Sequence, residues 1–81
     1  MRLDKFLKVS RILKRRSVAA NFASANKVTV NGNIAKPAKQ LKIGDKVTIA
    51  LGAHSLTFIV KILNEKVTKE FSDTLYEIIS E

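Results

Sequence analysis

The sequence predicts an α+β domain in which two short N-terminal helices pack on a small, mostly antiparallel sheet of four to five strands. Apolar residues recur at helical spacing up to about residue 26, and from residue 27 the spacing changes to alternation. An Asn-Gly pair follows the first alternating run at once. Helices followed by strands are typical of the α+β class. With 81 residues, 46% of them hydrophobic, the chain is long enough for one domain, residues 1–81.

The first predicted helix carries an apolar face and a cationic face. At about 100° of rotation per residue, its leucines, Phe6 and Ser10 gather in one sector. A basic residue stands at every third position of the same segment, namely Arg2, Lys5, Lys8, Arg11 and Lys14, and Arg15 and Arg16 close the run. A longer helix would bring Lys14 into the apolar sector, where an unpaired ammonium group is costly. The helix should therefore stop or turn between about Ser10 and Leu13.

The second predicted helix begins near Ser17, whose hydroxyl can cap the free N–H groups of a first helical turn. Val18, Ala19, Phe22 and Ala23 then follow at helical spacing. Asn26 stands where this helix would end, and asparagine tolerates the left-handed conformation found there. The basic patch should thus be built by two helices and the turn between them.

A β-hairpin is predicted next. Val28 and Val30 alternate with polar residues, and Asn31-Gly32 supplies the two positive φ angles that a type I′ turn requires. The second strand should run through Ile34 and end before Pro37, which has no N–H for the ladder. The residues KPAKQL are then expected to form an irregular basic connection.

The remaining strands follow from turn residues and β-branched runs. Gly44-Asp45 predicts a turn before an alternating strand, and Leu51-Gly52 predicts another. The run SLTFIVKIL, residues 55–63, is typical of a central strand, and LYEII, residues 75–79, is the predicted last strand. The polar stretch NEKVTKEFSDT between them has an irregular period and carries no assignment.

Charge is divided unevenly along the chain. Residues 1–64 hold 13 Lys and Arg against two acids, whereas the acidic segment 65–81 holds two lysines against five acids, and the net charge is +8. This distribution is typical of a protein that binds a polyanion. The alternative is that lysines merely keep a small protein soluble, which a cluster such as Arg2–Arg16 favours less than interspersed charges would.

Enzymatic and metal chemistry find little support. The chain has no cysteine, and its single histidine, His54, lies beside a glycine turn as an expected surface loop residue. Asp45 belongs to a turn pair with no nucleophile near it in sequence. We therefore expect no catalytic residue, no metal and no cofactor. No apolar run is long enough for a membrane span or a signal peptide, so a soluble, unprocessed cytoplasmic protein is expected.

Aromatic residues are predicted to serve the core. Phe6 and Phe22 fall on apolar helix faces, and Phe58 and Tyr76 fall in strands. A protein that binds single-stranded bases would instead show exposed aromatic residues beside basic ones. The sequence therefore favours recognition of a structured nucleic acid through its phosphates and shape, for which the planar arginine fork is well suited.

The order of these motifs resembles the S4-type RNA-binding domain family. The opening R-L-D-K-x-L, the helix start R-S-x-A, the hairpin V-x-V-N-G, the K-P after it and the G-D before a strand occur in that order over about residues 1–50. The chain length and the run KVSRILKRR are similar to RqcP-like (YabO-like) proteins of bacterial ribosome-associated quality control, which are relatives of heat-shock protein fifteen.

The resemblance implies an RNA-facing surface formed by the two helices and the hairpin. The candidate RNA-binding residues are Arg2, Lys5, Lys8, Arg11, Lys14, Arg15 and Arg16, with Lys27, Asn31 and Lys36 on the hairpin side. Asp4 would orient Arg2 or Arg16 by ion pairing, or favour the first helical turn through the helix dipole. The implied partners are large-subunit rRNA, peptidyl-tRNA, the large ribosomal subunit and an RqcH-like factor that adds alanine tails. The protein would act as a monomer without enzymatic activity.

Other functions stay open at this point. The chain could recycle large subunits that carry peptidyl-tRNA, as heat-shock protein fifteen does, or serve as the detached targeting module of an RNA-modifying enzyme. A DNA-binding helix-turn-helix protein is a third alternative, which the predicted sheet and the lack of an obvious dimerisation helix make weaker.

Overall fold

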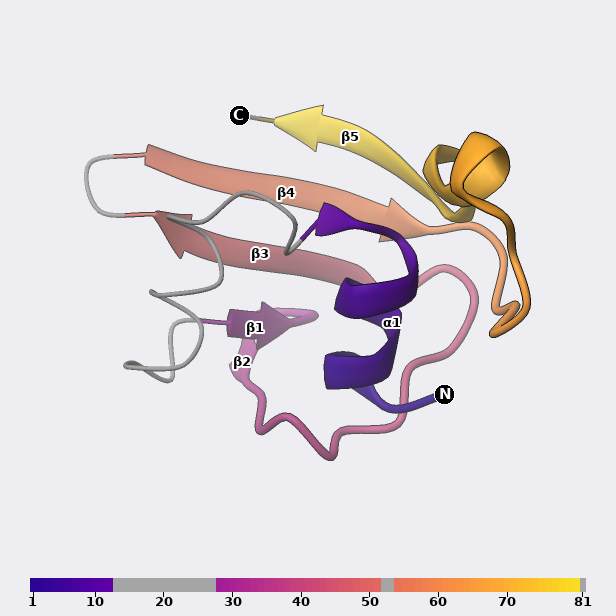
Figure 1. Cartoon of the computed structure of the whole chain (residues 1–81). Coiled ribbons are helices and arrows are strands. Elements are labelled where there is room, and N and C mark those ends of the chain that lie inside the picture. The colour runs from indigo at the N-terminus through magenta and orange to yellow at the C-terminus, as the bar shows by residue number, and fades with distance from the viewer. Residues whose placement is uncertain (13–27, 52–53, 81) are drawn as a thin grey trace.

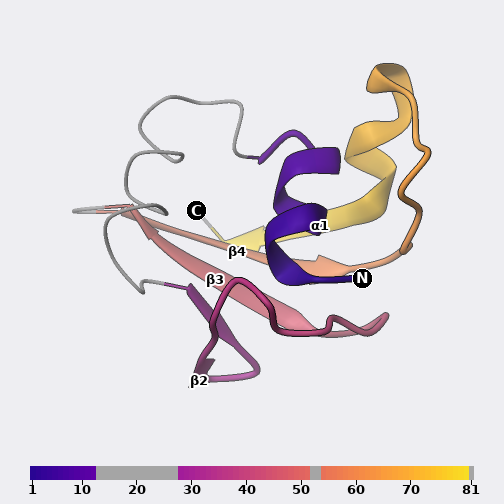
Figure 2. The same ribbon diagram turned by 60° about the horizontal axis from the view of Figure 1, so that its bottom comes forward.

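The computed structural model describes residues 1–12, 28–51 and 54–80. One helix, α1, packs against one face of a five-stranded antiparallel sheet (Figures 1 and 2). Its elements are α1 (Leu3–Val9), β1 (Val28–Val30), β2 (Asn33–Ile34), β3 (Lys46–Leu51), β4 (His54–Val60), the 3₁₀ helix η2 (Lys69–Leu75) and β5 (Tyr76–Ser80). The strand order is β2-β1-β3-β4-β5. The predicted α+β class and antiparallel sheet are confirmed, while the predicted second helix, 17–26, lies outside the described residues.

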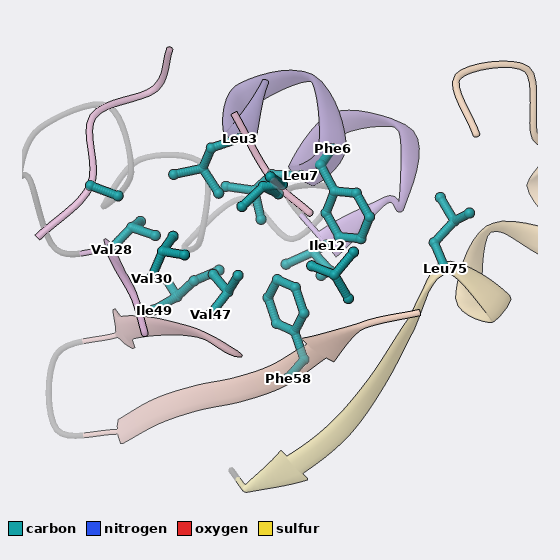
Figure 3. Close-up of a cluster of buried hydrophobic side chains, with 13 residues drawn as sticks. Leu3, Phe6, Leu7, Ile12, Val28, Val30, Val47, Ile49, Phe58 and Leu75 are labelled. Atoms are coloured by element: carbon teal, nitrogen blue, oxygen red, sulfur yellow. The ribbon is translucent and has the colours of Figure 1, made fainter. Parts of the chain in front are cut away.

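The core lies between α1 and the sheet, where Leu3, Phe6 and Leu7 are fully buried. Phe6 stacks on Phe58 of β4 with ring centroids 5.9 Å apart (Figure 3). Tyr76 of β5 meets the edge of the same Phe58 ring at 5.6 Å. These contacts agree with the predicted core roles of the three residues, and Phe22 lies outside the described residues.

Helix α1 ends at Val9, one residue before the predicted limits. The Ser10 N–H donates to the Phe6 carbonyl at 2.9 Å and the Arg11 N–H to the Lys8 carbonyl at 3.1 Å. Arg11 then adopts a left-handed backbone with φ +66°. Ser10 is buried on the apolar side of α1, and Ile12 is buried after the turn. The early stop agrees with the expectation that one straight helix cannot carry the whole basic run.

The hairpin follows the prediction closely. Asn31 and Gly32 have φ angles of +54° and +86°, as a type I′ turn requires. Val30 pairs with Asn33 and Thr29 with Ile34 across this turn. β2 ends at Ile34, and the chain then follows an irregular path to β3 past a turn at Gly44, whose φ is +95°.

The C-terminal part corrects two expectations and gives a structure to the stretch that had no assignment. His54 is the first residue of β4 and pairs with Leu51, so it does not lie in a loop. β4 ends at Val60, because the next two N–H groups both donate to the Leu75 carbonyl and leave the ladder. The unassigned polar stretch contains η2, which buries Ser72 and Leu75 and leaves Phe71 58% exposed.

Candidate RNA-binding surface

The exposed side of α1 carries three of the predicted cations. Arg2, Lys5 and Lys8 line one open surface depression together with Asp4. All three cations are exposed, since the helix turns its leucines and Phe6 toward the sheet. The structure thus brings together on α1 residues that the basic repeat predicted to share a face.

Asp4 is the carboxylate of this surface, and both of its oxygens are engaged. Oδ2 accepts a hydrogen bond from Arg2 Nη2 at 3.1 Å, and Oδ1 accepts one from the Lys5 N–H at 2.8 Å. Asp4 therefore contacts Arg2 and also satisfies a donor in the first turn of α1, where a negative charge is favourable. The Arg2 side chain is thus held by a neighbour from the first turn of α1.

The start of α1 is held by the β2–β3 connection, residues 35–45. The Leu3 N–H donates to the Lys39 carbonyl at 2.7 Å, and the Asp4 N–H donates to the Pro37 carbonyl at 3.0 Å. The Leu41 N–H donates in return to the Met1 carbonyl at 2.8 Å. Free N–H groups at a helix start commonly attract anions, but here protein carbonyls occupy them. The cationic side chains are therefore what α1 offers to a polyanion.

Arg11 stands just after α1, half-buried, at a position that most proteins fill with glycine. A left-handed backbone costs a residue with a Cβ about 1–2 kcal/mol. Arg11 continues the basic series of α1 beyond the end of the helix.

Asn31 lies at the hairpin turn with its side-chain amide bonded inside the protein. Its Nδ2 donates to Asp45 Oδ1 at 3.1 Å, and its Oδ1 accepts from the Lys46 N–H at 3.0 Å. These bonds join the hairpin turn to the start of β3. Asn31 therefore stabilises the fold, a role that its place in the RNA-binding motif did not predict.

Other predicted positions are divided between described and undescribed parts. Lys36 is exposed at the start of the β2–β3 connection. Lys14, Arg15, Arg16 and Lys27 lie outside the described residues. Sequence reasoning did not single out three further exposed cations, Lys39, Lys42 and Lys46. Their signal was present, because Lys36, Lys39 and Lys42 repeat the every-third spacing of the N-terminal basic run.

Within residues 1–12, 28–51 and 54–80, no three His, Cys, Asp or Glu side chains come close enough together to hold a metal ion. No helix in the same part of the chain has the length and apolar character needed to cross a membrane.

Comparison with known proteins gives consistent results. The S4 domain model matches residues 1–47. The RQC P-site tRNA stabilizing factor of Halalkalibacterium halodurans is 46% identical over all 81 residues, which cover 92% of that protein. The protein of the same name from Streptococcus pneumoniae is 47% identical over the same 81 residues and 92% of its own length.

A solved structure extends the likeness to the whole fold. The heat shock protein 15 of Vibrio cholerae, described as trimeric, is similar with a TM-score of 0.77 and 34% sequence identity. The match covers 98% of this chain and 81% of that one. The similarity thus includes β4 and β5, which lie beyond the residues matched by the domain model.

Proposed function

The chain belongs to the S4 domain family, and on that premise we propose that it is a non-enzymatic RNA-binding factor of ribosome-associated quality control. It binds large-subunit rRNA and peptidyl-tRNA on stalled, split ribosomes. There it holds the tRNA in place while an RqcH-like factor extends the stalled chain with alanine. The names of the relatives from Halalkalibacterium halodurans and Streptococcus pneumoniae support this role.

The proposal rests on the exposed cations of α1 and its N-cap, two of which have no carboxylate partner among the described residues. Lys5 and Lys8 are exposed and form no ion pair with any described residue, and Arg2 shares only Asp4. Cations without carboxylate partners are free to neutralise phosphates and release counterions. No exposed aromatic residue accompanies them on α1, which favours binding to a folded RNA through its backbone.

The setting implied by this function is the cytoplasm, on the large ribosomal subunit. We infer a monomer when bound there, because a single small surface suffices for contacts to rRNA and tRNA. An RqcH-like factor would share the subunit. Each of these statements depends on the RNA-binding surface being α1 and its surroundings.

Cosedimentation with purified large subunits tests the proposal. The wild-type chain should sediment with the subunits, whereas Arg2→Ala and Arg16→Ala should lose this association while keeping their circular dichroism spectra. Lys66→Ala, which removes one positive charge from the acidic segment, is the matched control and should bind normally. If both arginine variants bind subunits and tRNA like the wild type, the assignment is wrong.

Salt dependence gives a second, quantitative test. Four to six phosphate contacts would give a log–log slope of affinity against salt of roughly −3 to −5. A slope near zero would contradict binding through phosphates.

A second candidate function is recycling of large subunits that carry peptidyl-tRNA. The similarity in fold to the heat shock protein 15 of Vibrio cholerae favours it. Deletion of the gene for this chain distinguishes the quality-control role from the recycling role. Loss of alanine tails on stalled chains would support the quality-control role, whereas intact tails with accumulated subunit-bound peptidyl-tRNA would support recycling.

A further inference from the structure

The β2–β3 connection carries cations that the α1 surface does not include. Lys36, Lys39 and Lys42 stand on it at every third position, and Lys46 follows at the start of β3. All four are exposed, and none forms an ion pair with any residue that the structure describes. These four lysines are called the connection lysines below.

The backbone that bears the connection lysines is fixed at both ends. Its first half bonds to the start of α1 through the carbonyls of Pro37 and Lys39 and the N–H of Leu41. Its second half bonds to β4, because the Gly44 N–H donates to the Val60 carbonyl at 2.7 Å and the Val60 N–H donates to the Asp45 carbonyl at 2.9 Å. Cations on a fixed backbone lose less freedom on binding than cations on a mobile loop.

Asp45 is the carboxylate within this segment, and among the described residues it forms no ion pair with a connection lysine. Its Oδ1 accepts from Asn31 Nδ2 and its Oδ2 from the Lys42 N–H at 2.9 Å. Both oxygens thus serve the backbone and the hairpin turn. The lysine ammonium groups are left without a described carboxylate partner.

Exposed apolar side chains occur beside these cations. Ile34, at the end of β2, is 75% exposed, and Ile43, in the connection, is 66% exposed. They are the two most exposed of the large apolar residues in the described part of the chain. A ligand that combines anionic groups with apolar faces, as a phosphodiester chain combines phosphates with riboses and bases, fits this composition better than a small anion does.

The connection lysines are adjacent to the α1 cations and yet distinct from them. Arg2 lies opposite Gln40 in an isolated antiparallel bridge, so the connection runs beside the first residues of the chain. Figure 1 shows the connection passing around the N-terminal end of α1. An RNA strand bound to the α1 cations would therefore lie next to the connection lysines, which could bind further phosphates.

We propose that the connection lysines, with Ile34 and Ile43, form a second RNA-contact strip that binds a phosphodiester segment beside the one bound by α1. This rests on the proposed RNA-binding function. The two strips would let the protein hold two RNA segments, or two strands of one folded RNA, across the start of α1.

The test compares two double substitutions that remove equal charge from the full chain. Lys39→Gln with Lys42→Gln removes two connection lysines but keeps the main-chain bonds of both residues. Lys66→Gln with Lys69→Gln is the matched control in the acidic segment. Binding is measured against purified large-subunit rRNA and tRNA over a series of salt concentrations. The first pair should lower affinity roughly tenfold at low salt and reduce the slope by about 0.7 to 0.9 per lost contact.

The outcomes separate this proposal from the proposed function. The control pair should leave the slope unchanged. Arg2→Ala combined with the connection pair should weaken binding more than either change alone, since each removes phosphate contacts. If Arg2→Ala weakens binding and the connection pair behaves like the control pair, the second strip is wrong while the RNA-binding function stands. If the wild type binds neither RNA, the proposed function itself is wrong. Retained RNA binding by the connection pair with loss of an acidic protein partner would also overturn the second strip.

Discussion

The segments beside the two edges of the sheet, β2 and β5, differ in charge. On the β2 side, the connection holds Lys36, Lys39 and Lys42 with Asp45 as its acid, and the oxygens of Asp45 are taken up by hydrogen bonds. Beside β5, residues 70–80 hold three acids and no lysine or arginine, and one of these acids, Glu77, pairs with Lys61. Both edges expose isoleucine, so charge rather than apolar character distinguishes them.

Under the proposed function, this difference in charge would orient the chain on RNA. A negative edge opposite a positive one disfavours approach to RNA through β5 and favours approach through α1 and the β2 side. Substitutions that change the core or one edge at a time test this difference.

Phe58→Ala should have the largest effect, because Phe58 lies in β4 and joins the two sides through Phe6 and Tyr76. Removal of a fully buried ring lowers the free energy of unfolding by about 3–5 kcal/mol. Urea denaturation followed by circular dichroism measures the loss. Phe71→Ala is the matched control, since its ring is 58% exposed and should cost far less. Equal losses in the two variants would show that the core is not centred on Phe58.

Asn31→Ala should have the second-largest effect and should act on the β2 side alone. It removes the hydrogen bonds to Asp45 and Lys46 and places a Cβ without a polar group at φ +54°. We expect a loss of about 2 kcal/mol in the free energy of unfolding.

Asn31→Gly separates the two contributions to that loss. It removes the same hydrogen bonds but tolerates the left-handed backbone, so its loss should be about 1 kcal/mol. Chemical denaturation of both variants measures the difference. Both variants should bind RNA when folded, because the amide is used inside the protein. A folded Asn31→Gly variant that fails to bind RNA would instead make Asn31 a contact residue.

The parts that sequence predicted well depend on local chemistry. Asn31-Gly32 specifies its turn through its own φ preferences. The end of α1 near Ser10 is predicted because a longer helix would bring Lys14 into its apolar sector. The exposed α1 cations follow from the spacing of their leucine neighbours. Each of these features is decided within a few residues along the chain.

The parts that sequence missed depend on contacts between distant residues. η2 has no clear apolar period, and it is held by burial of Ser72 and Leu75 against the rest of the fold. The role of Asn31 depends on Asp45, fourteen residues away. The connection lysines become part of a surface only because Lys39 bonds to Leu3. No local pattern contains that information.

Arg11→Gly should change stability and binding in opposite directions. Glycine accepts φ +66° without strain, so the free energy of unfolding should rise by about 1 kcal/mol. RNA affinity should fall, because the guanidinium group is lost from the basic side. Thermal denaturation and RNA titration measure the two effects, and Arg11→Lys is the control that keeps charge and strain. If Arg11→Gly instead lowers the free energy of unfolding, the Arg11 side chain stabilises the folded chain by more than its backbone conformation costs.

Glu77→Gln should have the smallest effect and tests the β5 side. Glu77 Oε2 lies 3.1 Å from Lys61 Nζ, with both side chains about half exposed. Such surface pairs contribute about 0 to 1 kcal/mol, so the change in the free energy of unfolding should be small and should shrink further at high salt.

The informative measurement on Glu77→Gln is its RNA affinity, which should stay within about twofold of the wild type, because charges beyond a Debye length of roughly 10 Å are largely screened. Lys61→Gln breaks the same ion pair while changing the net charge in the opposite direction. If this ion pair lies far from the bound RNA, neither variant should change the RNA affinity. A rise in affinity for Glu77→Gln matched by a fall for Lys61→Gln would place β5 close to the phosphates. The β5 edge would then belong to the RNA-binding surface, and RNA would contact both edges of the sheet instead of the β2 edge alone.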